Sequence, residues 1–432
     1  MSRLWEVTAA LVAGLAITLA PAQAQTGSLN YTWGNGENDG QSAGTCAYIV
    51  PDNRPLQVPR TLVVDSAVPV GTVLYSWDFN SFLPGFRVQC TGSGIDNNTN
   101  NWVANGTASY GPIGMNVRIR GITVSPVSSN TNPVYATTLA GIGLRLSVKV
   151  DTDTEHDGTD YYQYVALIWA NGQYQSVGAA RDVVYTWGGG GYPEAYVGIK
   201  PYRSGISYPV RYSIPNAEAG FSVKAELVKT ADTVQYGSLG LAGDPRVVMT
   251  NAAEILNGTQ PTDLLTGNAI TVVSPSCRLR TTDYTISMGT WAADTMSHMG
   301  NPATGPAVPV GLDLECSGQV ADVQFRFEDT GSAPSTLAEK NVTLYDSGGN
   351  KVDGLEVQMK YNGNRVNIDG TTLTSTGSHG AVRTDAEAVP LYTSTSQAMF
   401  TANYIQNGAI RVGANNHTGP VSGKVNVWVT YN

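Results

Sequence analysis

The sharpest group of side chains that could do chemistry is an acidic run between Asp151 and Asp160. Counted from Asp153, its carboxylates alternate as far as Asp157 and a glycine follows, which is how a calcium-binding loop begins. Such a loop ends on a bidentate glutamate at its twelfth position, where this chain has Tyr164. We therefore interpret the run as a solvated hairpin tip, and calcium binding there stays an open alternative.

A second pattern with possible chemistry is GQSAG at residues 40–44, which matches the GxSxG motif of serine hydrolases. The motif acts only on a strand–turn–helix elbow with histidine and aspartate partners. Here it lies in a loop rich in Gly, Asn and Asp, two residues before Cys46. We interpret it as a chance match and predict no catalytic residue.

Metal chemistry is also poorly supported, because the chain has only four histidines, at positions 156, 298, 379 and 417. Three of them fall in the second half of the chain, so counting excludes a three-histidine zinc centre in the first half. No CxxC motif occurs, and we expect neither a metal nor a cofactor. Paired carboxylates of a glycosidase have no visible spacing in sequence, so a secreted carbohydrate-active enzyme stays an alternative.

Aromatic rings close to short polar side chains are the remaining lead. Sugars pack their C–H faces on aromatic rings, while their hydroxyls need fixed Asp, Asn and backbone partners. For each ring the alternative is a place in the core or at its rim. The candidate ligand-binding residues are Asp96, Asn97, Asn101, Trp102, Asp160, Trp187, Tyr192 and Tyr202.

The composition indicates which elements must position these side chains. Of 432 residues only 14% are charged, and 48 are glycine, with turn-forming clusters about every ten residues. No long segment has a 3.6-residue apolar period, so an all-β protein is expected. The net charge of −9 is spread along the chain, which argues against nucleic acid and anionic membrane surfaces as partners.

The first 24 residues have the features of a secretory signal peptide. Arg3 precedes an apolar run, and Pro21 and a small-residue cleavage site follow it. No later apolar run is long enough for a transmembrane helix. Export favours disulfides, and the four cysteines divide by spacing into an early and a late pair, Cys46–Cys90 and Cys277–Cys316.

The two cysteine pairs imply two disulfide-linked units. Turn and linker signals between residues 251 and 267 place the boundary near residue 262. The first unit, residues 25–262, has its clearest strands at 61–64, 117–124, 142–150, 162–169 and 221–228. In the second, residues 263–432, a strand at 269–273 leads into 277–279, and further strands are expected at 310–316, 323–327, 355–359 and 398–405.

The chain closes on KVNVWVTYN, residues 424–432, which alternates with the period of a half-buried strand. Together with GNAITVVSPSC at 267–277, VGLDLEC at 310–316 and FTANY at 400–404, this strand resembles the pilin domain of fimbrial subunits of the bacterial chaperone–usher pathway. A signal peptide, a large first domain and a pilin domain together are similar to the two-domain tip adhesins of that pathway, of the type 1 fimbrial kind.

The resemblance implies an immunoglobulin-like second domain that lacks its last strand, and a lectin-like β-sandwich as the first. Val425, Val427, Val429 and Tyr431 would line a groove that accepts a donor strand. Implied partners are a periplasmic chaperone, an outer-membrane usher, an adjacent fimbrial subunit and a host glycan or glycoprotein. The protein would reach the fimbrial tip on the cell surface through the periplasm. A structural subunit without a receptor is the alternative.

Overall fold

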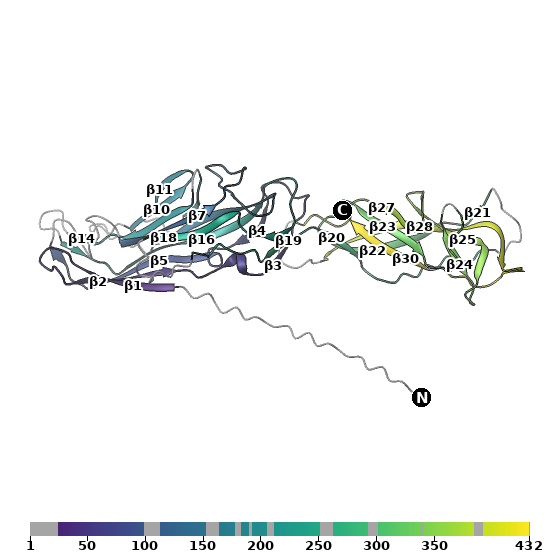
Figure 1. The fold of residues 1–432 in the computed structure, drawn as a ribbon, viewed down its shortest axis with the longest axis horizontal. Helices are drawn as coiled ribbons and strands as arrows, with labels where there is room; N and C mark the ends of the chain where they lie inside the picture. Colours follow the sequence, from purple (N-terminus) through teal and green to yellow (C-terminus); the bar gives the residue numbers. More distant parts are fainter. Residues whose placement is uncertain are drawn as a thin grey trace, which may run out of the picture.

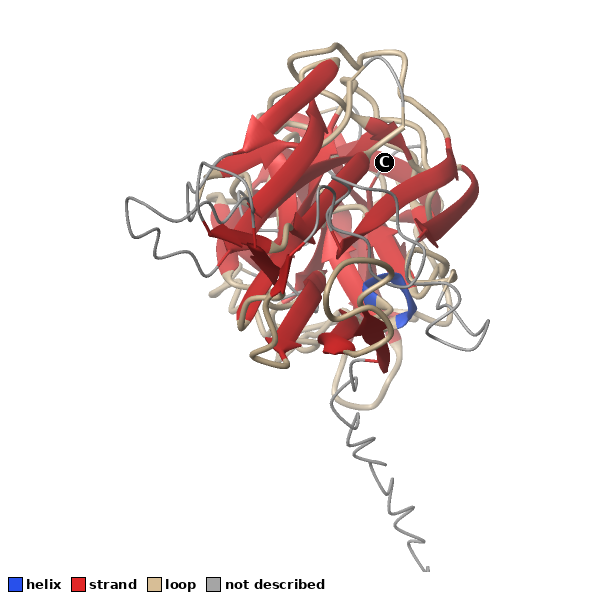
Figure 2. Ribbon diagram, turned by 90° about the vertical axis from the view of Figure 1, so that its left-hand side faces the viewer, coloured by secondary structure: helices blue, strands red, loops and turns tan. Residues whose placement is uncertain are grey.

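The computed structural model describes residues 25–98, 113–152, 164–177, 183–189, 192–204, 211–250, 262–292, 301–337, 340–383 and 392–431. Within these residues the regular structure is β-strand apart from one short 3₁₀ turn, η1 (Pro55–Gln57), the only helical ribbon in Figure 2. The strands form two units that lie end to end (Figure 1). The predicted all-β, two-domain architecture is confirmed. The predicted signal peptide, residues 1–24, lies outside the described residues.

The first unit is built on a large antiparallel sheet with the order β1–β2–β5–β16–β9–β12. Two further strands join it, β4 beside β16 and β8 beside β9. The central strand β16 has 13 residues and is hydrogen-bonded on both edges, to β5 and to β9, and most of its side chains are buried. The bounds are β1 (Gln25–Thr32), β2 (Ser42–Val50), β4 (Val73–Trp77), β5 (Leu83–Gly92), β8 (Tyr135–Ala136), β9 (Ile142–Thr152), β12 (Val184–Thr186) and β16 (Ala217–Lys229).

A second antiparallel sheet covers the first, and its strands have the order β11–β10–β13–β7–β18. Its strand β13 packs on β16 and β5, so the two sheets enclose one core, in which the rings of Phe86 and Phe221 stack 4.9 Å apart. The first unit is therefore a β-sandwich. The bounds are β7 (Ile113–Ile122), β10 (Tyr164–Ala170), β11 (Gln173–Val177), β13 (Glu194–Ile199) and β18 (Gly243–Thr250).

Two small sheets close the ends of this sandwich. The sheet of β14 (Tyr202–Ser204), β15 (Arg211–Ser213) and β6 (Asn97–Asn98) lies at the end remote from the second unit (Figure 1). The sheet of β17 (Gly237–Leu239), β19 (Ile270–Val273) and β3 (Arg60–Val63) lies at the end that faces the second unit (Figure 1). There β19 pairs with β3 in parallel.

The second unit is a smaller sandwich with the sheet orders β20–β22–β28–β25–β24 and β27–β23–β30. Phe400 of β28 lies between the sheets, with ring centroids 5.4 Å from Phe325 and 5.1 Å from Phe327 of β23. The bounds are β20 (Ser276–Leu279), β21 (Ala303–Thr304), β22 (Val308–Ser317), β23 (Val323–Asp329), β24 (Val342–Tyr345), β25 (Lys351–Tyr361), β26 (Asn364–Val366), β27 (Asp369–Ser375), β28 (Ser394–Val412), β29 (Asn415–Asn416) and β30 (Val425–Tyr431).

Both predicted disulfides are confirmed. Cys46 lies directly opposite Cys90 on β2 and β5, and Cys277 lies directly opposite Cys316 on β20 and β22. Each bond closes a loop of about forty residues (separations of 44 and 39), and in the chain-entropy model each contributes about 4 kcal/mol to stability. The two units are thus each held by one cross-link between neighbouring strands.

The change from one core to the other falls later than the predicted boundary of 262. Leu264, Leu265, Ile270 and Val272 are all buried in the core of the first unit, whereas Cys277 belongs to the core of the second. The expected continuous strand through residues 269–279 is therefore two strands in different units, β19 and β20. Pro275 lies between them, and it cannot donate a ladder hydrogen bond.

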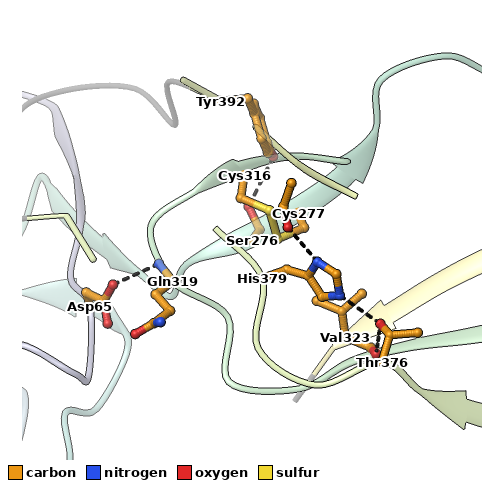
Figure 3. The surroundings of a disulfide bond; sticks show 10 residues. Asp65, Ser276, Cys277, Cys316, Gln319, Val323, Thr376, His379 and Tyr392 are labelled. Carbon is orange, nitrogen blue, oxygen red and sulfur yellow. Dashed lines mark hydrogen bonds between the residues drawn. A yellow bond between two sulfur atoms is a disulfide. The ribbon is translucent and has the colours of Figure 1, made fainter. Parts of the chain in front are cut away.

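The two units are joined by hydrogen bonds as well as by the chain. Asp65 follows β3, is 1% exposed, and accepts a hydrogen bond from the backbone N–H of Gln319 in the second unit at 2.8 Å (Figure 3). Its other carboxylate oxygen accepts from the Ala67 N–H, also at 2.8 Å. One buried carboxylate therefore links a turn of the first unit to the loop after Cys316.

Candidate functional site

The last strand, β30, is paired along only one of its edges within the described residues, and its partner there is β23. The carbonyl of Lys424 accepts a hydrogen bond from the Thr330 N–H. Because hydrogen-bonded and non-hydrogen-bonded pairs alternate along an antiparallel ladder, every second residue after Lys424 bonds to β23. The backbone groups of residues 426, 428 and 430 therefore face β23. Those of Val425, Val427, Val429 and Tyr431 face the opposite, open edge.

The side chains of β30 alternate in step with this backbone pattern. Val425, Val427 and Val429 are half-buried against the second core, while Tyr431 at the end of the strand is 40% exposed. On the other face Trp428 stacks on the guanidinium of Arg326, 4.4 Å from its ring centroid. The predicted groove residues thus share one side of the strand, and three of the four are partly covered by the core.

A second extended segment brings apolar side chains to the same core. It continues from β20, a strand in contact with β30, and it forms no ladder between residues 280 and 292. Tyr284, Ile286 and Met288 alternate along it as half-buried residues. A strand edge with unused backbone groups, flanked by partly buried apolar side chains, is the arrangement that accepts an added strand.

In the first unit, Asn97 lies in β6 of the small sheet at the remote end, and Asp96 directly precedes this strand. Asn97 is fully buried, and its Oδ1 accepts from the Asn38 N–H at 2.9 Å while its Nδ2 donates to the Asn35 carbonyl at 2.6 Å. Asp96 is exposed, and its carbonyl accepts from Asn38 Nδ2 at 2.7 Å. Asn97 therefore holds the loop 33–41 in place, and its polar atoms are already used.

Trp187 is placed in the core, which removes it from the set of surface rings expected from sequence. It is fully buried, its ring lies 6.1 Å from that of Phe221, and its backbone N–H donates to the Leu146 carbonyl. The adjacent glycines are also close to the core: Tyr135 Oη occupies the space that a side chain at Gly188 would need. At Gly188 the backbone therefore lies too close to the core for any residue with a side chain.

Tyr192 is 45% exposed and lies next to arginine side chains, with Arg120 Cζ 5.4 Å and Arg118 Cζ 5.9 Å from its ring centroid. Tyr192 lies just before the start of β13, where Glu194 is opposite Arg118 in the ladder with β7. Tyr202 comes after the end of β13 and begins β14. The backbone of Tyr202 pairs with Ser213 in the same small sheet as Asn97. The structure thus brings Asp96, Asn97 and the Tyr202 backbone together and places Tyr192 elsewhere.

The other expected ligand residues, Asn101, Trp102 and Asp160, lie outside the described residues, as does the acidic run from 153 to 160. Sequence reasoning missed the arginines beside Tyr192. Their signal was present in NVRIR, residues 116–120, where Asn116, Arg118 and Arg120 alternate with buried Val117 and Ile119. It also missed Arg211, which pairs with Glu37 of the loop 33–41 at 2.7 Å.

The chemical motifs that the sequence raised do not form reactive centres in the described residues. Ser42 of the GQSAG pattern begins strand β2, and its hydroxyl lies 3.4 Å from Asn30 Oδ1. No cluster of three or more His, Cys, Asp or Glu that could hold a metal occurs in the part of the chain that the structure describes. Nor is any helix in that part long and apolar enough to cross a bilayer.

No family model matches the chain, and no curated protein matches it. It is similar to the CupB6 tip adhesin from Pseudomonas aeruginosa, with 15% identity, a TM-score of 0.39, and coverage of 89% of this chain and 94% of that one. It is also similar to the P pilus rod subunit PapA, with 17% identity, a TM-score of 0.24, and coverage of 37% and 99%. The receptor-binding domain of the adhesin MrkD1P of Klebsiella pneumoniae matches at 18% identity, a TM-score of 0.20, and coverage of 52% and 93%.

Proposed function

We propose that this protein is a two-domain tip adhesin of a chaperone–usher fimbria. Its first domain would attach to a host glycan or glycoprotein, and its second would join the fimbria by accepting a donor strand. The partners of the second domain are a periplasmic chaperone, the outer-membrane usher and the adjacent subunit. We infer no enzymatic activity and place the protein at the fimbrial tip on the cell surface.

The observation that supports this proposal is the open edge of β30. Val425, Val427, Val429 and Tyr431 direct their backbone groups to that edge, and within the described residues no strand pairs with it. An open edge with apolar side chains promotes aggregation unless another chain covers it. A borrowed strand would satisfy the backbone groups and complete the burial of the three valines at once.

The assembly role can be tested with a matched pair of variants on β30. Val427→Lys puts a charge on the half-buried side of the strand, whereas Asn426→Lys puts the same charge on an exposed position of the same strand. The protein is recovered from the periplasm in complex with its chaperone, and the amount of complex is measured. We expect at least a tenfold loss for Val427→Lys and near-normal recovery for Asn426→Lys. Equal recovery of both would refute strand acceptance at this edge.

The adhesive role is tested separately, with the full mature chain on an array of glycans and matrix proteins. A tip adhesin binds at least one of them, whereas a structural subunit without a receptor binds none. The first unit is a complete sandwich with its own core and its own disulfide. This completeness favours the adhesin, because a filament subunit needs only the acceptor domain.

A further inference from the structure

The outward face of β7 and β18 carries three arginines. Arg118 and Arg120 are on β7, and Arg246 on β18 lies directly opposite Arg120 in the ladder. Like charges in directly opposed positions destabilise an antiparallel pair. Glu194 pairs with Arg118 at 2.6 Å and Asp244 pairs with Arg246 at 2.8 Å. Among the described residues no carboxylate forms an ion pair with Arg120, so this guanidinium can accept an anion from outside.

A β-bulge shapes the surface beside Arg120. The β7–β18 register shifts between Gly243 and Arg246, so two residues of β18 oppose Gly121. Gly121 has φ +72°, and a Cβ there would come within 2.1 Å of the Asp244 carbonyl oxygen, so only glycine fits. The bulge lies at a depression of about 330 Å³ lined by Arg120, Gly121, Ile122, Val124 and Tyr192. Bulges of this kind commonly re-aim side chains at binding sites.

Tyr192 orients the arginine and adds an apolar wall. Its ring lies 5.4 Å from Arg120 Cζ, within the range of a cation–π contact. Val124 is 51% exposed, so its methyl groups present apolar surface at the depression. The depression thus combines one available guanidinium with an aromatic edge and two aliphatic side chains. This combination suits a ring with C–H faces and one anionic substituent, because arginine binds carboxylate and sulfate through two parallel N–H donors.

We propose that this face of the first domain binds an acidic saccharide residue, with Arg120 holding its carboxylate or sulfate group and Tyr192, Ile122 and Val124 contacting the ring. The proposal rests on the proposed function only in taking the first domain as the ligand-binding unit. The proposed site lies at the start of β13, remote from the loop 33–41 and from Asp96, which lie beyond the other end of that strand. The proposal also gives the class of glycan.

The test measures binding of the full mature chain to three defined probes. The probes are 3′-sialyllactose, which carries a carboxylate, a heparin-derived hexasaccharide, which carries sulfates, and neutral lactose. We expect one or both acidic probes to bind, lactose to bind at least tenfold more weakly, and added salt to weaken the acidic complexes. Which acidic probe binds then identifies the anionic group. Failure of both acidic probes to bind, or equal binding of lactose, would overturn the proposal.

Variants locate the site. Arg120→Gln and Tyr192→Ala should each weaken the acidic complex by about tenfold or more, since each removes a contact with the ligand. The matched control is Arg278→Gln in the second unit, an exposed arginine that likewise stacks on a tyrosine, Tyr392, at 4.2 Å. Thermal unfolding shows whether each variant is folded. Loss of binding in the control, or full binding by a folded Arg120→Gln, would refute the site. Neither result affects strand acceptance by β30, which is measured separately.

Discussion

The sharpest consequence of the β30 geometry concerns individual amide groups. We consider the mature chain extended at its C-terminus by a flexible linker and a strand of alternating valine and threonine, seven residues long to match β30. If this added strand pairs with the open edge, the N–H groups of Val425, Val427, Val429 and Tyr431 gain partners. Those of residues 426, 428 and 430 already bond to β23 and gain none.

The expected slowing of amide hydrogen exchange follows from the number of backbone hydrogen bonds that the added strand forms. Ordering the added residues costs about 1–2 kcal/mol each, and burial of their inward valines, at about 1.5–3 kcal/mol each, offsets most of that cost. The four outward-facing residues each offer one N–H and one C=O, so up to eight new bonds form at about 1 kcal/mol net each. After the remaining ordering cost of roughly 3–4 kcal/mol, about 4 kcal/mol is left in favour of the paired state. Since 1.4 kcal/mol is a factor of ten, exchange at the four amides should slow by about three orders of magnitude.

Amide hydrogen exchange, resolved to single residues, measures this directly. The control extension has the same length and composition with two prolines in its strand, which cannot donate ladder hydrogen bonds. We expect protection of the four odd-numbered residues in the first protein only. Protection that appears instead at Asn426, Trp428 and Thr430 would refute the derived ladder pattern. Unchanged exchange at all seven would refute the edge as a strand acceptor.

Two further predictions concern the junction and the second core. Asp65→Ala removes the acceptor of the Gln319 N–H, at a cost of about 1–3 kcal/mol to the docked state, so the undocked population should rise roughly 5- to 150-fold. Small-angle scattering measures this population, and Asp322→Ala in the second unit is the control. Unchanged scattering of the Asp65→Ala variant would contradict the role of Asp65 at the junction. Burial lowers the pKa of His379, which is 6% exposed. Below about pH 6.5 the unfolded chain therefore binds more protons, and stability falls on acidification toward the lowered pKa. Calorimetry from pH 7 to pH 5 should show a smaller loss for His379→Gln, and equal losses would refute this assignment.

Strand positions were predictable because they depend on local alternation. Val310, Leu312 and Leu314 alternate with polar residues, and they form one buried face of β22 as expected. Both disulfides followed from spacing, since each joins residues brought opposite one another by neighbouring strands. The split between β19 and β20 was less visible, although Pro275 marks it. Residues 270–273 are apolar enough for either core, and their pairing with β3 and β17 assigns them to the first.

Candidate ligand residues were harder to predict, because exposure is decided by contacts between residues far apart in sequence. Trp187 and Tyr192 flank the same glycine run, yet one is fully buried and the other is 45% exposed. Trp187 is covered because its ring meets Phe221 of the central strand β16. Tyr192 stays at the surface because the register of β13 with β7 places it beside the outward-facing Arg118 and Arg120. Local composition is the same for both rings, so the order and register of the sheets decide which of them can contact a ligand.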